Sequence, residues 1–201
     1  MHLLILVSPL TLAASLGLFI ATAAQRLRIG GRAAARLNPE KRWTYDQHAV
    51  LEFIEALRRS SGTGADASAR RLGDYRSRVL RLDIGFALSF SAFIVLTSLL
   101  LAHWPGASPW LTGAGTTLAG FGVLYGACDV GEDIKLIQTL SHAERLLPLH
   151  HDGKADPDAP ALADAAQVDA ANVLTRLKFI TFWASLFGLI VLTALARFLP
   201  H

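Results

Sequence analysis

Three acidic residues follow a long apolar stretch, and their type and spacing suit chemistry. Glu132 and Asp133 follow Asp129 by three and four positions, so a helix would place the three carboxylates on one face. Like charges at this spacing repel each other unless cations face them, and carboxylates near a membrane can also hold a proton or a cation. Ion pairs that lock helices together, a cation or proton site, and simple solvation are therefore the three interpretations.

The depth of these acids is set by Trp110, which would anchor the start of their helix at the membrane interface. Asp129 follows Trp110 by about 28 Å of helix rise, so it would lie at the inner edge of a hydrocarbon core of roughly 30 Å. The other charged residues expected at this level are Arg81, Asp83, Arg176 and Lys178.

The elements that would position these residues are four apolar blocks, at 3–24, 84–104, 111–128 and 179–199. The chain is 52% hydrophobic and only 17% charged, and the blocks contain no charged residue except Arg197 near the chain end. Each block is long enough to cross a bilayer as a helix. We therefore predict an all-α fold, a four-helix transmembrane bundle whose third and fourth helices extend into a cytoplasmic helical hairpin.

Orientation follows from lysine and arginine counts. The segment from Gln25 to Arg81 contains thirteen, the segment from Asp129 to Lys178 contains five, and Arg197 alone would lie outside. The positive-inside rule places both long segments in the cytoplasm. Only Met1 and His2 precede the first block, so we expect a retained anchor rather than a cleaved signal peptide. The prediction is a multi-pass inner-membrane protein with both termini on the outer, periplasmic side.

The expected domain order follows from these blocks. The segments are transmembrane helix 1 at 1–24, a basic cytoplasmic segment with one or two helices at 25–82, transmembrane helix 2 at 83–104, an outer turn at 105–110, transmembrane helix 3 with its extension at 111–147, a hairpin tip at 148–158, and a cytoplasmic helix that continues into transmembrane helix 4 at 159–201.

The two cytoplasmic parts have their own patterns. Thr44 and Gln47 predict a capping box for a helix that ends near Arg59, whose apolar face would be covered by the bilayer surface or by other cytoplasmic residues. The hairpin seam is expected from apolar spacing at Ile134, Ile137, Leu140 and Leu147 against Leu162, Ala166, Ala170, Val173 and Leu177. The first part has a net positive charge and the second a net negative charge, so they would dock together, meet charged partners, or be solvated independently.

Gly122 and Gly126 have the spacing that lets helices approach closely, for internal packing or for dimerisation. His2, His103 and His201 lie at the outer ends of the apolar blocks and the other histidines lie in the cytoplasmic segments, so we expect no haem. We also expect no other cofactor. His150, His151 and Asp152 in the hairpin tip are weak metal candidates without a recognised ligand spacing.

The stretch from Ala127 to Asp133, with Leu136 and with the entry to the last block at Arg176 to Phe179, resembles an uncharacterised group of bacterial four-span inner-membrane proteins. Those proteins commonly have Asp-x-x-Glu-Asn in the third span and a lysine at the start of the fourth. The resemblance covers the C-terminal half, and Asp133 replaces the usual asparagine. It implies four spans and pairing of the acids with Lys178, but no activity.

The leading functional hypothesis is a non-enzymatic accessory, scaffold or assembly subunit, because no catalytic constellation is present. Its expected partners are the lipid bilayer, anionic lipid headgroups, and another membrane protein or further copies of itself, but not nucleic acid. The alternative is a small oligomeric cation or proton transporter or channel that uses the acidic cluster. A third hypothesis is a lipid-modifying enzyme in which Asp83 and Glu132 share a metal ion.

Overall fold

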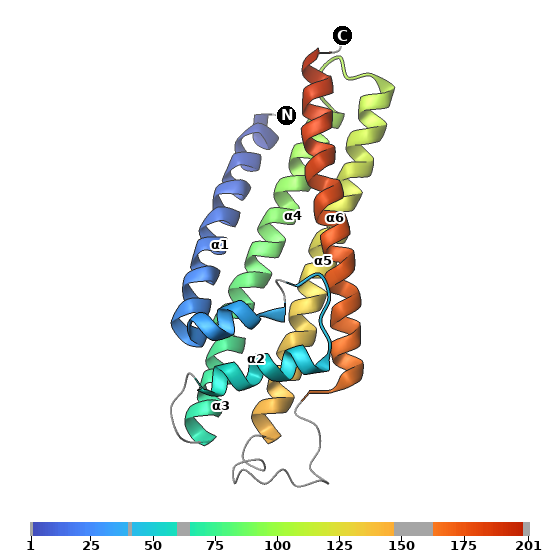
Figure 1. The fold of residues 1–201 in the computed structure, drawn as a ribbon. Helices are drawn as coiled ribbons and strands as arrows, with labels where there is room; N and C mark the ends of the chain where they lie inside the picture. The colour runs from blue at the N-terminus through green and yellow to red at the C-terminus, as the bar shows by residue number, and fades with distance from the viewer. Residues whose placement is uncertain (1, 40–41, 60–64, 147–162, 199–201) are drawn as a thin grey trace. The chain divides into compact units, whose positions relative to one another are not determined.

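The computed structural model describes residues 2–39, 42–59, 65–146 and 163–198 (Figure 1). Its elements are α1 (His2–Leu37), α2 (Gln47–Arg59), α3 (Ala65–Asp74), the π-helical segment η2 (Tyr75–Leu80), α4 (Arg81–Ala102), α5 (Pro109–Leu146) and α6 (Ala165–Phe198). No strand occurs within these ranges. The predicted all-α class is therefore confirmed.

Three helical stretches among the described residues are long and apolar enough to cross a membrane: Val7–Leu37, Ala69–Ala102 and Ala165–Ala196. The second includes α3, η2 and α4, which follow one another without a break. The third block of the sequence lies in α5, and α5 is not one of these three stretches. Glycine and threonine are frequent in its first half, and both residues contribute little hydropathy.

The described chain consists of two compact units. The first, here called the apolar unit, comprises Met1–Leu18, Gly85–Val130 and Leu177–His201, and its sequence contains only three charged residues, Asp129, Lys178 and Arg197. The second, called the charged unit, comprises Phe19–Ile84 and Gly131–Arg176. Each of the four long helices therefore contributes residues to both units.

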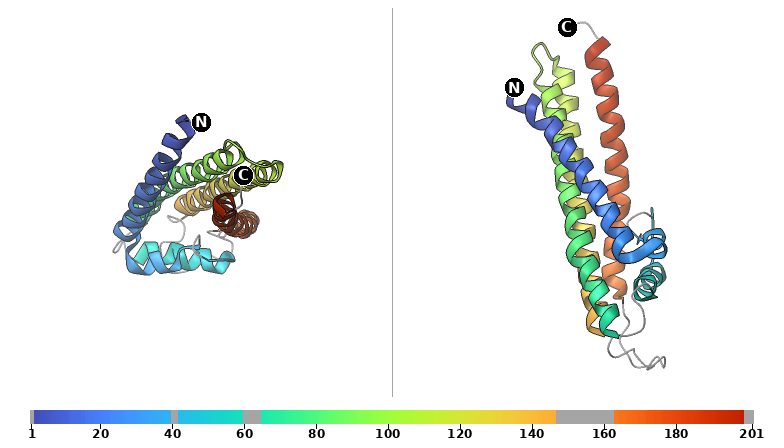
Figure 2. Two further views of the ribbon diagram at one scale, coloured as in Figure 1. Left: turned by 90° about the horizontal axis from the view of Figure 1, so that it is seen from above. Right: turned by 90° about the vertical axis from the view of Figure 1, so that its left-hand side faces the viewer.

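In the apolar unit, α4 and α5 run side by side (Figure 2). Ile94 of α4 and Tyr125 of α5 belong to a core that also includes Leu118 and Leu189. Many large apolar side chains of this unit are nevertheless exposed, among them Trp183 at 48% and other members of α1, α4, α5 and α6. Such a surface is costly in water and suits a lipid surrounding.

In the charged unit, the amphipathic helix α2 lies crosswise to α5 (Figure 1). Its predicted apolar face is buried, with Phe53 and Ile54 at 2% and 1% exposure. This face belongs to a core with residues of α3, η2, α5 and α6, so other parts of the chain cover it. The predicted capping box at Thr44 is wrong: Asp46 caps the helix, because its Oδ1 accepts a hydrogen bond from the Ala49 amide at 2.9 Å.

The last part of α1 belongs to the charged unit and changes direction at Gly31, where φ is 66° and ψ is −176°. A side chain is strained at this φ, so glycine is the residue that permits the change. The following turn returns Ala34 to the core, where it is 1% exposed. Gly30 lies close behind it, since a Cβ there would be 2.9 Å from the Cβ of Ala34.

The predicted hairpin seam is correct at Leu140, which is 2% exposed, and Ile137 packs against the same core. It is wrong at Ile134, Val173 and Leu177, which are 44%, 56% and 41% exposed. The other residues of α5 and α6 that enter the core of the charged unit are Leu136, Ala143, Val168 and Ala171. The sequence analysis paired α5 with α6 alone, whereas α2 and η2 contribute to the same core and so change which faces are buried. Leu147 and Leu162 lie outside the described residues.

Candidate functional site

The acids predicted as a functional cluster are all buried. Asp129, Glu132 and Asp133 are 4%, 0% and 0% exposed, in agreement with their common helical face. Asp129 belongs to the apolar unit, whereas Glu132 and Asp133 belong to the charged unit. Their surroundings are therefore described separately.

In the apolar unit, Asp129 of α5 forms an ion pair with Lys178 of α6. The distance from Lys178 Nζ to Asp129 Oδ1 is 2.8 Å, and the two side chains are 12% and 5% exposed. Tyr125, one helical turn before Asp129, donates its hydroxyl hydrogen to Asp129 Oδ2 at 2.8 Å. Both carboxylate oxygens thus have a donor, which is what a buried carboxylate requires.

An aromatic cluster holds Tyr125 in position for this hydrogen bond. Its ring packs edge-on against Phe90 of α4, with centroids 5.6 Å apart, and lies 5.8 Å from the ring of Phe182 of α6. Phe90 and Phe182 also stack on each other. The ion pair and the aromatic cluster therefore connect α4, α5 and α6 at one level of the apolar unit.

In the charged unit, Glu132 accepts hydrogen bonds from neutral groups of two other segments. Thr175 Oγ1 of α6 lies 2.5 Å from Glu132 Oε1, and the Tyr45 hydroxyl lies 3.4 Å from the same oxygen. Tyr45 precedes α2, and its backbone amide donates to Asn172 Oδ1 at 3.1 Å. Glu132 therefore joins α5 to α6 and to the segment before α2. Sequence analysis missed Tyr45 and Thr175, because neither has a recognisable spacing to the acid.

A second buried ion pair, within the charged unit, joins α1 to α4. Arg26 Nη2 lies 2.6 Å from Asp83 Oδ2, and the side chains are 10% and 12% exposed. Arg26 was not predicted as the partner of Asp83. Their positions in the sequence could have indicated this pair, because Arg26 follows the first apolar block by two residues and Asp83 immediately precedes the second.

Two cations predicted beside the acids are exposed instead, namely Arg81 and Arg176. Each is two residues from a buried charged residue on the same helix, Asp83 and Lys178 respectively. Two residues correspond to about 200° around an α-helix, so the two side chains of each pair occupy opposite faces. The prediction considered the depth of each residue along its helix but not the direction of its side chain.

Gly122 and Gly126 of α5 lie against α4 within the apolar unit. A Cβ on Gly122 would be 2.7 Å from Ile94 Cγ2, and a Cβ on Gly126 would be 2.7 Å from Ser91 Oγ. The Ser91 hydroxyl donates to the carbonyl oxygen of Gly122 at 2.8 Å. Both glycines therefore permit close packing inside the chain.

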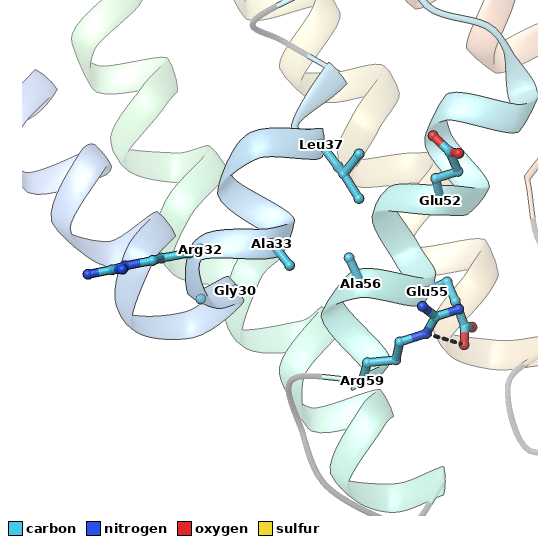
Figure 3. Close-up of a pocket in the computed structure, with 9 residues that line it drawn as sticks. Gly30, Arg32, Ala33, Leu37, Glu52, Glu55, Ala56 and Arg59 are labelled. Carbon is cyan, nitrogen blue, oxygen red and sulfur yellow. Dashed lines mark hydrogen bonds and ion pairs between the residues drawn. The ribbon is translucent and has the colours of Figure 1, made fainter.

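A groove of about 490 Å³ lies in the charged unit between the end of α1 and α2 (Figure 3). Its apolar lining consists of the side chains of Ala33, Leu37 and Ala56, which lie near one another (Figure 3). Its rim includes Glu55 and Arg59, whose side chains form an ion pair at 3.4 Å. The groove contains no arrangement of nucleophile and base, so its features suit contact rather than catalysis.

No group of three histidine, cysteine, aspartate or glutamate side chains that could hold a metal occurs in the described part of the chain. The weak metal candidates His150, His151 and Asp152 lie outside the described residues. Asp83, which a metal shared with Glu132 would require, is paired with Arg26.

Comparison with protein-family models, with curated proteins and with solved structures finds no match for this chain. The function of this chain is therefore inferred from the geometry of its buried charges and pockets.

Proposed function

We propose that this chain is a non-enzymatic integral membrane protein that serves as an accessory, scaffold or assembly subunit. The observation that supports this function best is the state of the buried charges. Asp129 and Lys178 form one closely spaced pair, and Arg26 and Asp83 form another. Each pair joins two long helices, which is a structural use of charge.

In the proposed topology the chain crosses an inner membrane four times, with both termini on the outer side. The three long apolar stretches supply three crossings, and the first half of α5 supplies the fourth. This half contains no charged residue before Asp129 and packs closely on α4. The count of lysine and arginine supports cytoplasmic positions for both long polar segments.

The cytoplasmic ends of α5 and α6 would extend as a helical hairpin, and this hairpin with the basic segment would contact a partner. The buried core of the charged unit, with α2 across α5, supports such a contact surface. Arg28 and Arg32 on the basic segment are exposed and available for contact. Resemblance of the Asp129 region to uncharacterised four-span proteins also supports the four-span topology.

A reconstitution experiment tests the structural role of the charges. In liposomes, the purified protein is expected to conduct neither protons nor monovalent cations above the level of empty liposomes. Asp129→Asn is expected to lower the melting temperature in detergent, since it leaves Lys178 buried without its counter-charge. Proton or cation flux that Asp129→Asn abolishes would overturn the proposal.

Contact with a partner is tested separately by copurification from native membranes. We expect a membrane protein to copurify and its recovery to fall when Arg28 and Arg32 are both replaced by Gln. Arg81→Gln, an exposed substitution on a different helix, is the matched control. Equal recovery of the partner with the native chain, the double variant and Arg81→Gln would contradict the assignment of Arg28 and Arg32 as contact residues.

A second candidate function is a small oligomeric cation or proton transporter or channel. It is favoured by the adjacent carboxyl groups Glu132 and Asp133, both fully buried, and by the two neutral hydroxyl groups on Glu132 Oε1. The liposome assay distinguishes this function by Glu132→Gln, with Glu52→Gln at an exposed position of α2 as the control. Transport that only Glu132→Gln removes would establish it.

A further inference from the structure

A second, smaller pocket in the charged unit has a different chemistry from the groove in Figure 3. It has a volume of about 300 Å³ and lies between the segment that leads into α2 and the side of α6. Its lining residues are Arg42, Thr44, Tyr45, Asp46, Ala49, Asn172 and Arg176. Most of these side chains are hydrogen-bond donors, and two are permanently charged.

The two guanidinium groups of this pocket come from different segments, Arg42 from the segment before α2 and Arg176 from α6. Arg42 is partly buried and Arg176 is exposed. Within the described part of the chain, neither takes part in an ion pair of 4.0 Å or less. Both arginines line the same pocket, and their like charges repel each other, so an anion bound between them would be stabilising.

The neighbouring polar groups are already oriented in a way that leaves donors for such an anion. Asn172 Oδ1 accepts the hydrogen bond of the Tyr45 amide, so the amide nitrogen of the same side chain remains as a donor. Asp46 is the one acid in the lining, and its Oδ1 is used by the Ala49 amide as the cap of α2. The hydroxyl of Thr44 adds a donor on the same side as Arg42.

We infer that this pocket binds a phosphate group, held by Arg42 and Arg176 with Asn172 and Thr44 as additional donors. Arginine pairs with phosphate through parallel hydrogen bonds, which is why two of them suit a tetrahedral, doubly charged oxyanion. Two sources share this chemistry, the headgroup of an anionic phospholipid and a soluble phosphate ester.

Two observations favour the lipid source. Arg176 precedes the last apolar block, which begins at residue 179, by three positions, a distance that suits headgroup level. Trp43, beside Arg42 in sequence, is 51% exposed, as is typical of an aromatic side chain at a membrane interface. The lipid source rests on the proposed membrane location, whereas binding of soluble phosphate does not.

The test is binding to the full chain purified in a neutral detergent, measured by native mass spectrometry and by thermal shift. The probes are short-chain phosphatidic acid, short-chain phosphatidylcholine and inorganic phosphate. We expect phosphatidic acid to bind and phosphatidylcholine to bind at least about tenfold more weakly, because choline neutralises the headgroup. Inorganic phosphate that binds as tightly as phosphatidic acid would support the site with a soluble source.

Three variants make the result specific to the pocket. Arg42→Gln and Arg176→Gln are each expected to weaken binding of phosphatidic acid by about tenfold or more, as loss of a charge-assisted hydrogen bond does. Arg81→Gln removes an exposed arginine outside the pocket and is expected to leave binding unchanged. An equal effect of all three substitutions, or no binding of either phosphate probe to the folded native chain, would overturn the inference. Retained helical circular dichroism shows that each variant is folded.

Discussion

Replacement of Gly122 by alanine tests the close packing of α5 on α4. The new Cβ would lie 2.7 Å from Ile94 Cγ2, 3.1 Å from Ile94 Cβ and 3.2 Å from Val95 Cγ2. Carbon atoms in favourable contact are about 3.5 to 4.0 Å apart, so the overlap is close to 1 Å. Ile94 is 1% exposed and has no free space to occupy. Overpacking of this kind costs roughly 1 to 3 kcal/mol.

Gly120 supplies a matched control on the same helix. A Cβ at Gly120 meets no atom within 4 Å. Alanine has a higher helix propensity than glycine by up to about 1 kcal/mol, and this gain is common to both substitutions. The difference in stability between Gly122→Ala and Gly120→Ala therefore reports the packing against Ile94 and Val95 of α4.

The assay is thermal unfolding of the two variants in the same detergent, with circular dichroism as the signal that monitors unfolding. For a chain of this size, a difference of 1 to 3 kcal/mol corresponds to roughly 2 to 12 °C in melting temperature, with Gly122→Ala the lower. Equal melting temperatures would refute the packing of α5 on α4. A lower value for Gly120→Ala would place the contact on the other face of α5.

Three further outcomes are expected in the same unfolding assay. Lys178→Met should destabilise the protein by about 3 to 5 kcal/mol, because Asp129 remains buried without its counter-charge, and Asp129→Asn in the same chain should restore part of the loss; strictly additive effects would argue against the pair. Gly31→Ala should cost about 1 to 2 kcal/mol, because its φ is 66°, and an unchanged melting temperature would show that the chain does not turn there. Thr175→Val should cost about 1 to 3 kcal/mol, because it removes the hydroxyl from Glu132, and a stabilised variant would contradict that hydrogen bond.

Much of the helical content was accessible from the sequence, because long uncharged blocks determine helices locally. The predicted helix that ends near Arg59 is α2, which ends at Arg59. Neither the π-helical segment at Tyr75–Leu80 nor the turn at Gly31 was predicted, because both depend on tertiary contacts more than on local pattern.

The acidic residues of the candidate site could be identified from the sequence, but most of the residues that bind them could not. The burial of Asp129, Glu132 and Asp133 follows from their spacing and from the apolar block before them. Partners such as Tyr45 come from remote segments, and their contacts with Glu132 depend on how α2 crosses the other helices. The seam residues Ile134, Val173 and Leu177 were misassigned for the same reason, since a periodic pattern gives the apolar face of a helix but not which neighbour covers it.

The account depends most on the long apolar helices crossing a bilayer, so that the turn near Ser108 and helix α2 lie on opposite sides of it. The most direct measurement uses chains with Cys128→Ala and a single new cysteine, either Ser108→Cys or Glu52→Cys, both at exposed positions. These are treated with a membrane-impermeant maleimide in intact spheroplasts and after lysis. We predict that Ser108→Cys is labelled in intact spheroplasts and that Glu52→Cys is labelled only after lysis. Labelling of both positions in intact spheroplasts would contradict the account.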